Sequence, residues 1–272
     1  MPTAAAPAGS PGPGPALREY VVAELAAAIQ SLAARGSRMH AGVHLARKSM
    51  RRTRAALALG DVLGPGAKVI DRELRRLNRG LSTLRDAHAL VETLDRLVAK
   101  RHDDDIRLRL ARARRVAAHK RAGLARQPVV ARNVVETRAL LVMLQAAVLG
   151  LPWEEIAAPM LQEALAATSR DVASARDRAC SRDRDEDWHR WRRRVRRLSQ
   201  QHRACLAAGI ASAPSMFDKS LAEQLGVMQD LTLLLEHCGP GSPFSKPDAA
   251  GLRRFARTAL ARQRKRVASI GA

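Results

Sequence analysis

The chain has 272 residues, of which 48 are basic and 26 acidic, so its formal net charge at pH 7 is +22. Such an excess of positive charge calls for an anionic partner: nucleic acid, an acidic membrane surface or another polyanion. Hydrophobic residues make up 46% of the chain and aromatic residues only 3%, so alanine, leucine and valine must fill the core.

The first fifteen residues, rich in proline, glycine and alanine, are expected to form a disordered tail over 1–15. They lack the charged start and long apolar stretch of a signal peptide, and no apolar run reaches the roughly 18 residues that span a bilayer. The cysteines at 180, 205 and 238 have neither CxxC spacing nor metal-ligand spacing from a histidine. Buried free thiols in a reducing compartment are expected, which indicates a cytoplasmic protein.

Helical periodicity predicts an all-α chain, because no stretch alternates with period two for long enough to form a strand. The acidic run at 103–105 is typical of a helix start, and Gly80 is a point where one helix is expected to break. The predicted helices are 16–34, 40–62, 67–99, 103–126, 129–149, one opening at 151–155, 185–208, 215–237 and 247–270.

Two stretches repeat one another at long range. "HLARKSMRRTR" begins at His44 and "HRWRRRVRRLS" begins at His189, 145 residues later. Steps of three, four, seven and eight residues stay on one side of an α-helix, so each stretch predicts a cationic stripe. The first stripe is His44, Arg47, Lys48, Arg51 and Arg52, and the second is His189, Arg192, Arg193, Arg196 and Arg197.

A second landmark repeats at nearly the same distance. "LNRGLSTLRDAHAL" leads to Asp86, and "LAEQLGVMQDLTLL" leads to Asp230, 144 residues later. Eleven residues before each aspartate stands a cation, Arg75 or Lys219, and Lys120 and Lys265 form a further pair 145 residues apart. The repeat predicts two halves, 16–127 and 153–270, each a four-helix unit, joined by a linking helix within 128–152.

Clustered arginine side chains must be solvated by water or must bind anions, because burying an unpaired charge is costly. Guanidinium groups match phosphate oxygens in bidentate geometry, and a bound polyanion would favour the charged form of a nearby imidazole. The two stripes therefore predict a row of phosphates as the ligand, held in a basic groove or channel between pseudo-two-fold-related faces.

The motifs "VHLARKSMRRTRAAL", "LRDAHAL", "WHRWRRRVRRL" and "LGVMQDLTLL" resemble the conserved histidine α-helical domain family, abbreviated CHAD. The resemblance covers nearly all of the chain after the tail. It implies two four-helix bundles related by pseudo-symmetry around a basic central pore that binds inorganic polyphosphate. It also implies association with polyphosphate granules or with polyphosphate-metabolising enzymes. The sequence itself predicts no cofactor and no metal site, because no two of the remaining histidines form a metal site by spacing alone.

The resemblance places both stripes along this pore and adds Arg75, Lys120, Lys219 and Lys265. Asp86 and Asp230 are expected to orient arginines, since phosphate would repel them. The halves also differ: Arg54 corresponds to Ser199, Arg85 to Gln229, and Ser82 to Gly226.

Three other functions compete with polyphosphate binding. A nucleic-acid-binding protein fits the net charge but leaves few aromatic rings for base stacking. A phosphotransfer protein would use His44 or His189 as acceptor, yet no partner domain is present in the sequence. A polyphosphate-processing enzyme would need carboxylates to hold Mg²⁺, and the acidic runs at 103–105 and 154–155 are explained as helix starts. The sequence therefore predicts a non-catalytic binding protein.

Overall fold

The structure is a computed structural model that describes residues 12–100, 103–210 and 219–269. Every regular element in these ranges is a helix, which confirms the predicted all-α class. Three elements are single 3₁₀ turns, η1 (Gly36–Arg38), η2 (Asp61–Leu63) and η3 (Trp153–Glu155). The α-helices are α1 (Pro13–Ser31), α2 (Met39–Leu57), α3 (Gly64–Gly80), α4 (Ser82–Val98), α5 (Asp104–Ala125), α6 (Pro128–Leu149), α7 (Ala158–Arg182), α8 (Asp185–Ala207), α9 (Lys219–His237) and α10 (Lys246–Ser269).

Several helix boundaries follow from proline and glycine. Helix α1 begins at Pro13, inside the range 1–15 predicted as a tail, because proline suits the first turn of a helix; residues 1–11 lie outside the description. The predicted break at Gly80 separates α3 from α4. The segment expected to open a helix at 151–155 forms only the turn η3, and α7 starts at Ala158 with a proline in its first turn.

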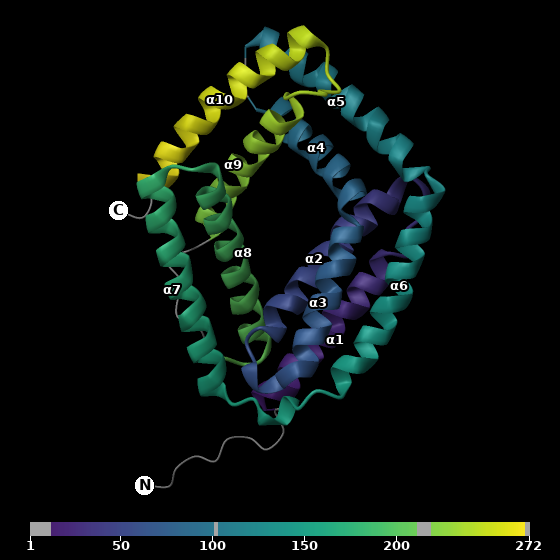
Figure 1. The fold of residues 1–272 in the computed structure, drawn as a ribbon, viewed down its shortest axis with the longest axis vertical. Coiled ribbons are helices and arrows are strands. Elements are labelled where there is room, and N and C mark those ends of the chain that lie inside the picture. The colour runs from purple at the N-terminus through teal and green to yellow at the C-terminus, as the bar shows by residue number, and fades with distance from the viewer. Residues whose placement is uncertain (1–11, 101–102, 211–218, 270–272) are drawn as a thin grey trace.

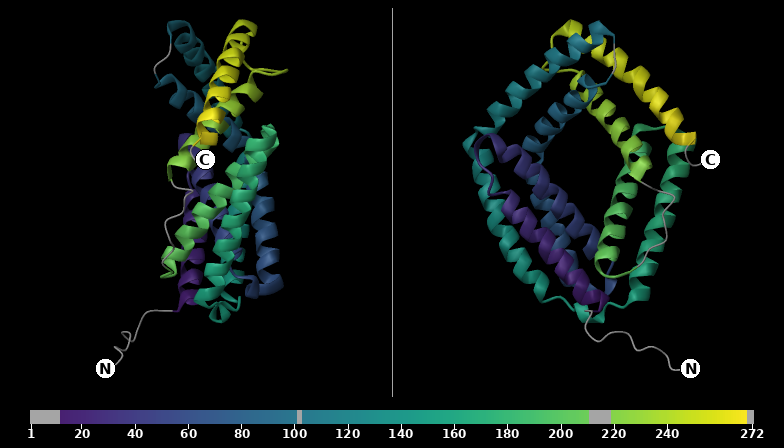
Figure 2. Two further views of the ribbon diagram at one scale, coloured as in Figure 1. Left: turned by 90° about the vertical axis from the view of Figure 1, so that its left-hand side faces the viewer. Right: turned by 180° about the vertical axis from the view of Figure 1, so that it is seen from behind.

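The helices pair as antiparallel hairpins arranged in a ring (Figure 1). The closest pairs are α1 with α2, α4 with α5, α7 with α8, and α9 with α10. Helices α2, α4, α8 and α9 lie on the inner side of the ring and α5, α6, α7 and α10 on the outer side, and Figure 2 shows the same ring from behind. The halves meet where α2 packs against α8, α4 against α9, and α5 against α10.

Small residues let these helices approach closely. A side-chain Cβ on Gly42 would lie 2.2 Å from the carbonyl oxygen of Ser31, so the contact between α1 and α2 requires glycine there. A Cβ on Gly14 would likewise lie 1.8 Å from the carbonyl oxygen of Trp153. The Trp153 ring is fully buried, and its indole N–H donates to the carbonyl oxygen of Val148 at 2.7 Å.

The repeat read from the sequence is also visible in the packing. A shift of 144 to 145 residues carries α1, α2 and α5 onto α7, α8 and α10, and most of α4 onto α9. The contacts between halves are reciprocal: α2 packs on its own counterpart α8, and α4 on its counterpart α9. Such self-paired contacts are typical of a two-fold relation. The further idea that each half closes into one four-helix bundle stays a prediction.

Candidate functional site

The two cationic stripes lie on helices that contact each other, α2 and α8. Each helix buries apolar residues on its opposite side. Helix α2 buries Val43, Ala46 and Met50, and α8 buries Trp191 and Val195. The arginines are thereby turned toward the space between the two helices and their neighbours.

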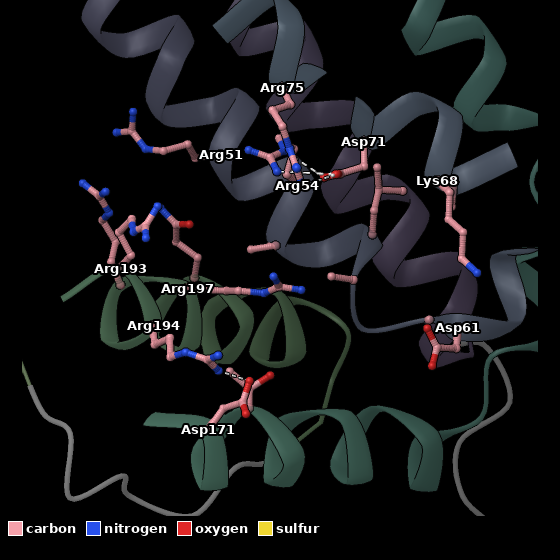
Figure 3. A pocket seen from close by; sticks show the side chains of 18 of the residues that line it. Arg51, Arg54, Asp61, Lys68, Asp71, Arg75, Asp171, Arg193, Arg194 and Arg197 are labelled. Carbon is pink, nitrogen blue, oxygen red and sulfur yellow. Dashed lines mark hydrogen bonds and ion pairs between the residues drawn. The ribbon is translucent and has the colours of Figure 1, made fainter. Parts of the chain in front are cut away.

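The larger cavity, of about 940 Å³, lies between α2 and α3 on one side and α7 and α8 on the other. Figure 3 shows arginines of α2 and α3 across this space from arginines of α8. Three carboxylates also line it, and two of them are paired: Asp71 with Arg54 at 2.7 Å, and Asp171 with Arg194. The nine basic residues of its lining are Arg51, Arg54, Lys68, Arg75, Arg190, Arg193, Arg194, Arg196 and Arg197.

A smaller cavity, of about 310 Å³, lies between α2, α8 and α9. No carboxylate is among its lining residues in the described part of the chain. Arg51, Arg196 and Gln200 line both cavities, so the two meet at the contact between α2 and α8. The titratable residues that line the smaller cavity are His44, Lys48, Arg51, Arg52, Arg192, Arg196 and Arg203.

The arginines at this junction repel one another. Burial, followed by the charges of Arg196 and Arg47, lowers the pKa of Arg51 to about 9. Burial, followed by the charges of Arg196 and Arg85, lowers the pKa of Arg192 to about 9. Burial is also the main cause of the lowered pKa of Arg196. An added anion would relieve these costs, because an opposite charge stabilises the protonated guanidinium.

Several of the cations that line the two cavities have no carboxylate partner within the described chain. Among the described residues, Lys48, Arg51, Arg193 and Arg196 form no ion pair with a carboxylate. The buried Nε atom of Arg51 makes no hydrogen bond within the described chain, and neither does the Nε atom of Arg47. Arg47 lines neither cavity, and it donates from another nitrogen to the carbonyl oxygen of Asn78. The junction therefore offers several positively charged hydrogen-bond donors to an external anion.

The two stripe histidines have different surroundings. His44 lines the smaller cavity, and its Nδ1 lies 3.9 Å from a carboxylate oxygen of Glu92. His189 lines neither cavity, and its Nδ1 lies 3.1 Å from the side-chain oxygen of Gln229, which also accepts from Arg192 at 3.3 Å. Partial burial lowers the pKa of both rings. Both are therefore neutral at pH 7 in the anion-free protein.

The other predicted site residues differ in whether they line a cavity. Arg52 lines the smaller cavity but is paired with Glu24 at 2.9 Å. Arg75 lines the larger cavity, paired with Asp71 at 3.3 Å. Lys120 and Lys265 are exposed on the outer helices α5 and α10 and line neither cavity. Lys219 begins α9, and its side chain lies outside the described residues.

Asp86 and Asp230 both contact arginines. Asp230 accepts two hydrogen bonds at 2.8 Å from Arg96, which lies in the opposite half, and a third at 3.0 Å from Thr93. Asp86 accepts from the adjacent Arg85 at 3.0 Å. Asp230 therefore connects α9 to α4, whereas the ion pair of Asp86 stays within one helix.

The stripe pattern did not single out several cavity residues. Arg203 follows Arg196 by seven residues, so the spacing that predicted the stripe could also have found it. Arg54, Lys68, Arg190 and Arg194 line the larger cavity from beside the stripes or from α3. No sequence signal identifies these four, because their role depends on which helices pack face to face.

Comparison with known proteins agrees with this architecture. The family model of the CHAD domain matches residues 19–239, and the chain therefore belongs to the CHAD domain family. The chain is also similar to the crystal structure of the CHAD domain from the plant Ricinus communis, with a TM-score of 0.61 at 20% sequence identity. That match covers 99% of this chain and 92% of the plant chain, and at this identity it shows the fold alone. No match is found among curated proteins.

Within the described residues, no helix is both long and apolar enough to cross a bilayer.

Proposed function

We propose that this chain binds inorganic polyphosphate, without catalysis, in the two linked cavities at the contact between α2 and α8. The observation that carries the proposal is the junction itself, where Arg51 and Arg196 line both cavities without a carboxylate partner among the described residues. Two cavities that meet at one point suit a linear chain of phosphates, because successive groups can fill both. Each phosphate would replace repulsion between arginines with charge-assisted hydrogen bonds.

The arrangement favours polyphosphate over nucleic acid. Protein recognition of single-stranded nucleic acid depends on bases stacked against aromatic rings. No aromatic side chain in the described ranges is exposed, and Trp153, Trp188 and Trp191 are buried. A polyphosphate chain carries the same repeating charge without bases, so it needs only the cations that line the cavities.

The proposal extends to the cellular role that family resemblance implies. We expect the protein to act in the cytoplasm at polyphosphate granules, or beside a polyphosphate-metabolising enzyme. The catalytic step would belong to that enzyme, since among the described residues the only carboxylates lining the larger cavity are Asp61, Asp71 and Asp171, and two of these are held by arginines.

The test is a titration with long-chain polyphosphate. It distinguishes the effect of charges at the cavities from the effect of the total charge of the protein. The site variant replaces Arg51, Arg192, Arg193 and Arg196, which line the two cavities, with glutamine. The control variant replaces four exposed arginines that have no ion pair in the described chain, Arg115, Arg126, Arg132 and Arg138, with glutamine. Both lower the net charge equally. We expect the site variant to lose binding while the control stays close to wild type; equal losses in two folded variants would overturn the proposal.

A further inference from the structure

Three titratable side chains from two facing helices converge beside the smaller cavity. His44 lies on α2, and His88 and Glu92 lie on α4, one helical turn apart. Each residue offers one possible ligand atom, a ring nitrogen or a carboxylate oxygen, and these three atoms all lie within 4.8 Å of one another. A second α2 histidine, His40, stands one turn before His44, with its ring centroid 4.6 Å from that of His88.

The distances suit a metal ion. Tetrahedral Zn²⁺ holds nitrogen and oxygen ligands at about 2.0–2.2 Å, which sets neighbouring ligand atoms about 3.3–3.6 Å apart. In the metal-free protein His88 Nε2 lies 3.5 Å from one oxygen of Glu92, and His44 Nδ1 lies 3.9 Å from the other. Small side-chain rotations therefore bring the three groups to coordination distance.

The helical arrangement and the ligand chemistry agree. Pairs of ligands one turn apart on facing helices are a recurrent way to build metal sites in helical proteins. Two imidazoles and one carboxylate match a common protein ligand set for Zn²⁺, whereas Mg²⁺ and Ca²⁺ prefer oxygen ligands throughout.

The internal repeat shows that this cluster is not a consequence of the fold. The counterparts of His88 and Glu92, 144 residues later, are Thr232 and Glu236, and the counterpart of His40 is Asp185. The Thr232 hydroxyl donates to the carbonyl oxygen of Met228 at 3.0 Å, like an ordinary helical threonine. The second half keeps the position of His44, as His189, but lacks the His88 ligand.

We propose that His44, His88 and Glu92 bind one divalent transition metal ion, with Zn²⁺ the best match, between α2 and α4. His40 or a water molecule fills the fourth position. Nearby cations oppose the ion: the charges of Arg51, Arg85 and Lys48 act on His44, and an Arg121 nitrogen lies 3.4 Å from Nδ1 of His88. Binding through Nε2 moves the ring proton to Nδ1, so Arg121 must give up this contact.

The test is calorimetric titration of the purified chain with Zn²⁺, with no phosphate compound present. We expect one ion per chain, no competition from Mg²⁺, and the visible absorption of tetrahedral Co²⁺ when that ion replaces Zn²⁺. His88→Thr, which installs the residue of the second half, and Glu92→Gln should each weaken binding by about 100-fold. Arg121→Gln should strengthen it, a gain that misfolding cannot produce.

His119, which is exposed on α5, provides the control. His119→Ala should bind Zn²⁺ as wild type does. Binding that survives both His88→Thr and Glu92→Gln, or that His119→Ala reduces equally, would show adventitious binding to surface histidines and overturn the proposal. Because the titration contains no polyphosphate, its result is independent of the proposed function.

Discussion

Arg51 on α2 and Arg196 on α8, which are 145 residues apart, lie at the junction of the two cavities, and burial, followed by the charge of Arg196, lowers the pKa of Arg51. Two like charges held together at a contact between repeated halves cost stability in the absence of an anion. This cost is the physical basis for the first prediction.

Arg51→Met and Arg196→Met should each stabilise the anion-free protein and weaken polyphosphate binding. Methionine keeps the apolar stem of the side chain and removes the buried charge. We expect this change to stabilise the fold by about 1–2 kcal/mol and to raise Tm by about 2–4 °C. Thermal melts with and without polyphosphate measure both effects. Arg132→Met on the exposed face of α6 is the control, and lower melting temperatures for both junction variants would contradict the prediction.

Polyphosphate binding should strengthen as pH falls, in part through His189. Partial burial, with the charges of Arg193 and Arg192, lowers the pKa of this ring below its ordinary value of 6.5. A bound polyanion favours the charged ring and raises that pKa, so the complex takes up a proton that the free protein does not hold. Binding should therefore tighten from about pH 7.5 to about pH 5.5.

Affinity measurements across this pH range, on wild type and His189→Gln, provide the check. The variant should lose part of the pH dependence, because glutamine cannot take up the proton. An unchanged pH profile in His189→Gln would show that the ring does not sense the ligand.

Asp230→Asn should destabilise the fold more than Asp86→Asn. Asp230 accepts three hydrogen bonds from Arg96 and Thr93 across the contact between α9 and α4, whereas within the described part of the chain Asp86 accepts only from its neighbour Arg85. Because Arg96 is half exposed, we expect a loss of about 1 kcal/mol for Asp230→Asn and less than about 0.5 kcal/mol for Asp86→Asn. Urea denaturation measures both values, and the reverse order would contradict the assignment.

Gln229→Arg should strengthen polyphosphate binding and lower Tm in its absence. Gln229 occupies the position that corresponds to Arg85, and its side-chain oxygen accepts from Arg192 and lies 3.1 Å from His189. Arginine would remove this acceptor and add a charge beside other cations. Gln229→Leu removes the same acceptor without adding charge, so an equal gain in affinity for that variant would refute an electrostatic cause.

The sequence predicted the positions of the helices better than it predicted which of their side chains line the cavities. Proline, glycine and apolar periodicity located most elements, including the break at Gly80, and the repeat identified α2 and α8 as counterparts. The periodicity of one helix does not determine which neighbour faces it. For that reason Lys120 and Lys265 were placed at the site although they lie exposed on outer helices, while Arg54 and Arg194 of the larger cavity were missed.

The cluster of His44, His88 and Glu92 was missed for the same reason. His44 and His88 are 44 residues apart, a spacing that matches no local metal-binding motif. They come together only because α2 and α4 pack against each other, and nothing in the local sequence of either helix specifies that contact.

The most direct test of the proposed function is a competition between long-chain polyphosphate and duplex DNA for the purified protein, over a salt series that includes physiological ionic strength. Salt weakens every polyanion complex, so the ranking of the two ligands decides the outcome, and the salt dependence alone does not. If the linked cavities are the site, polyphosphate displaces DNA at physiological salt, and the variant with Arg51, Arg192, Arg193 and Arg196 replaced by glutamine loses this preference. If DNA competes equally, or if the folded variant keeps the preference, the positive charge acts as a diffuse surface property and the cavities are not a polyphosphate site.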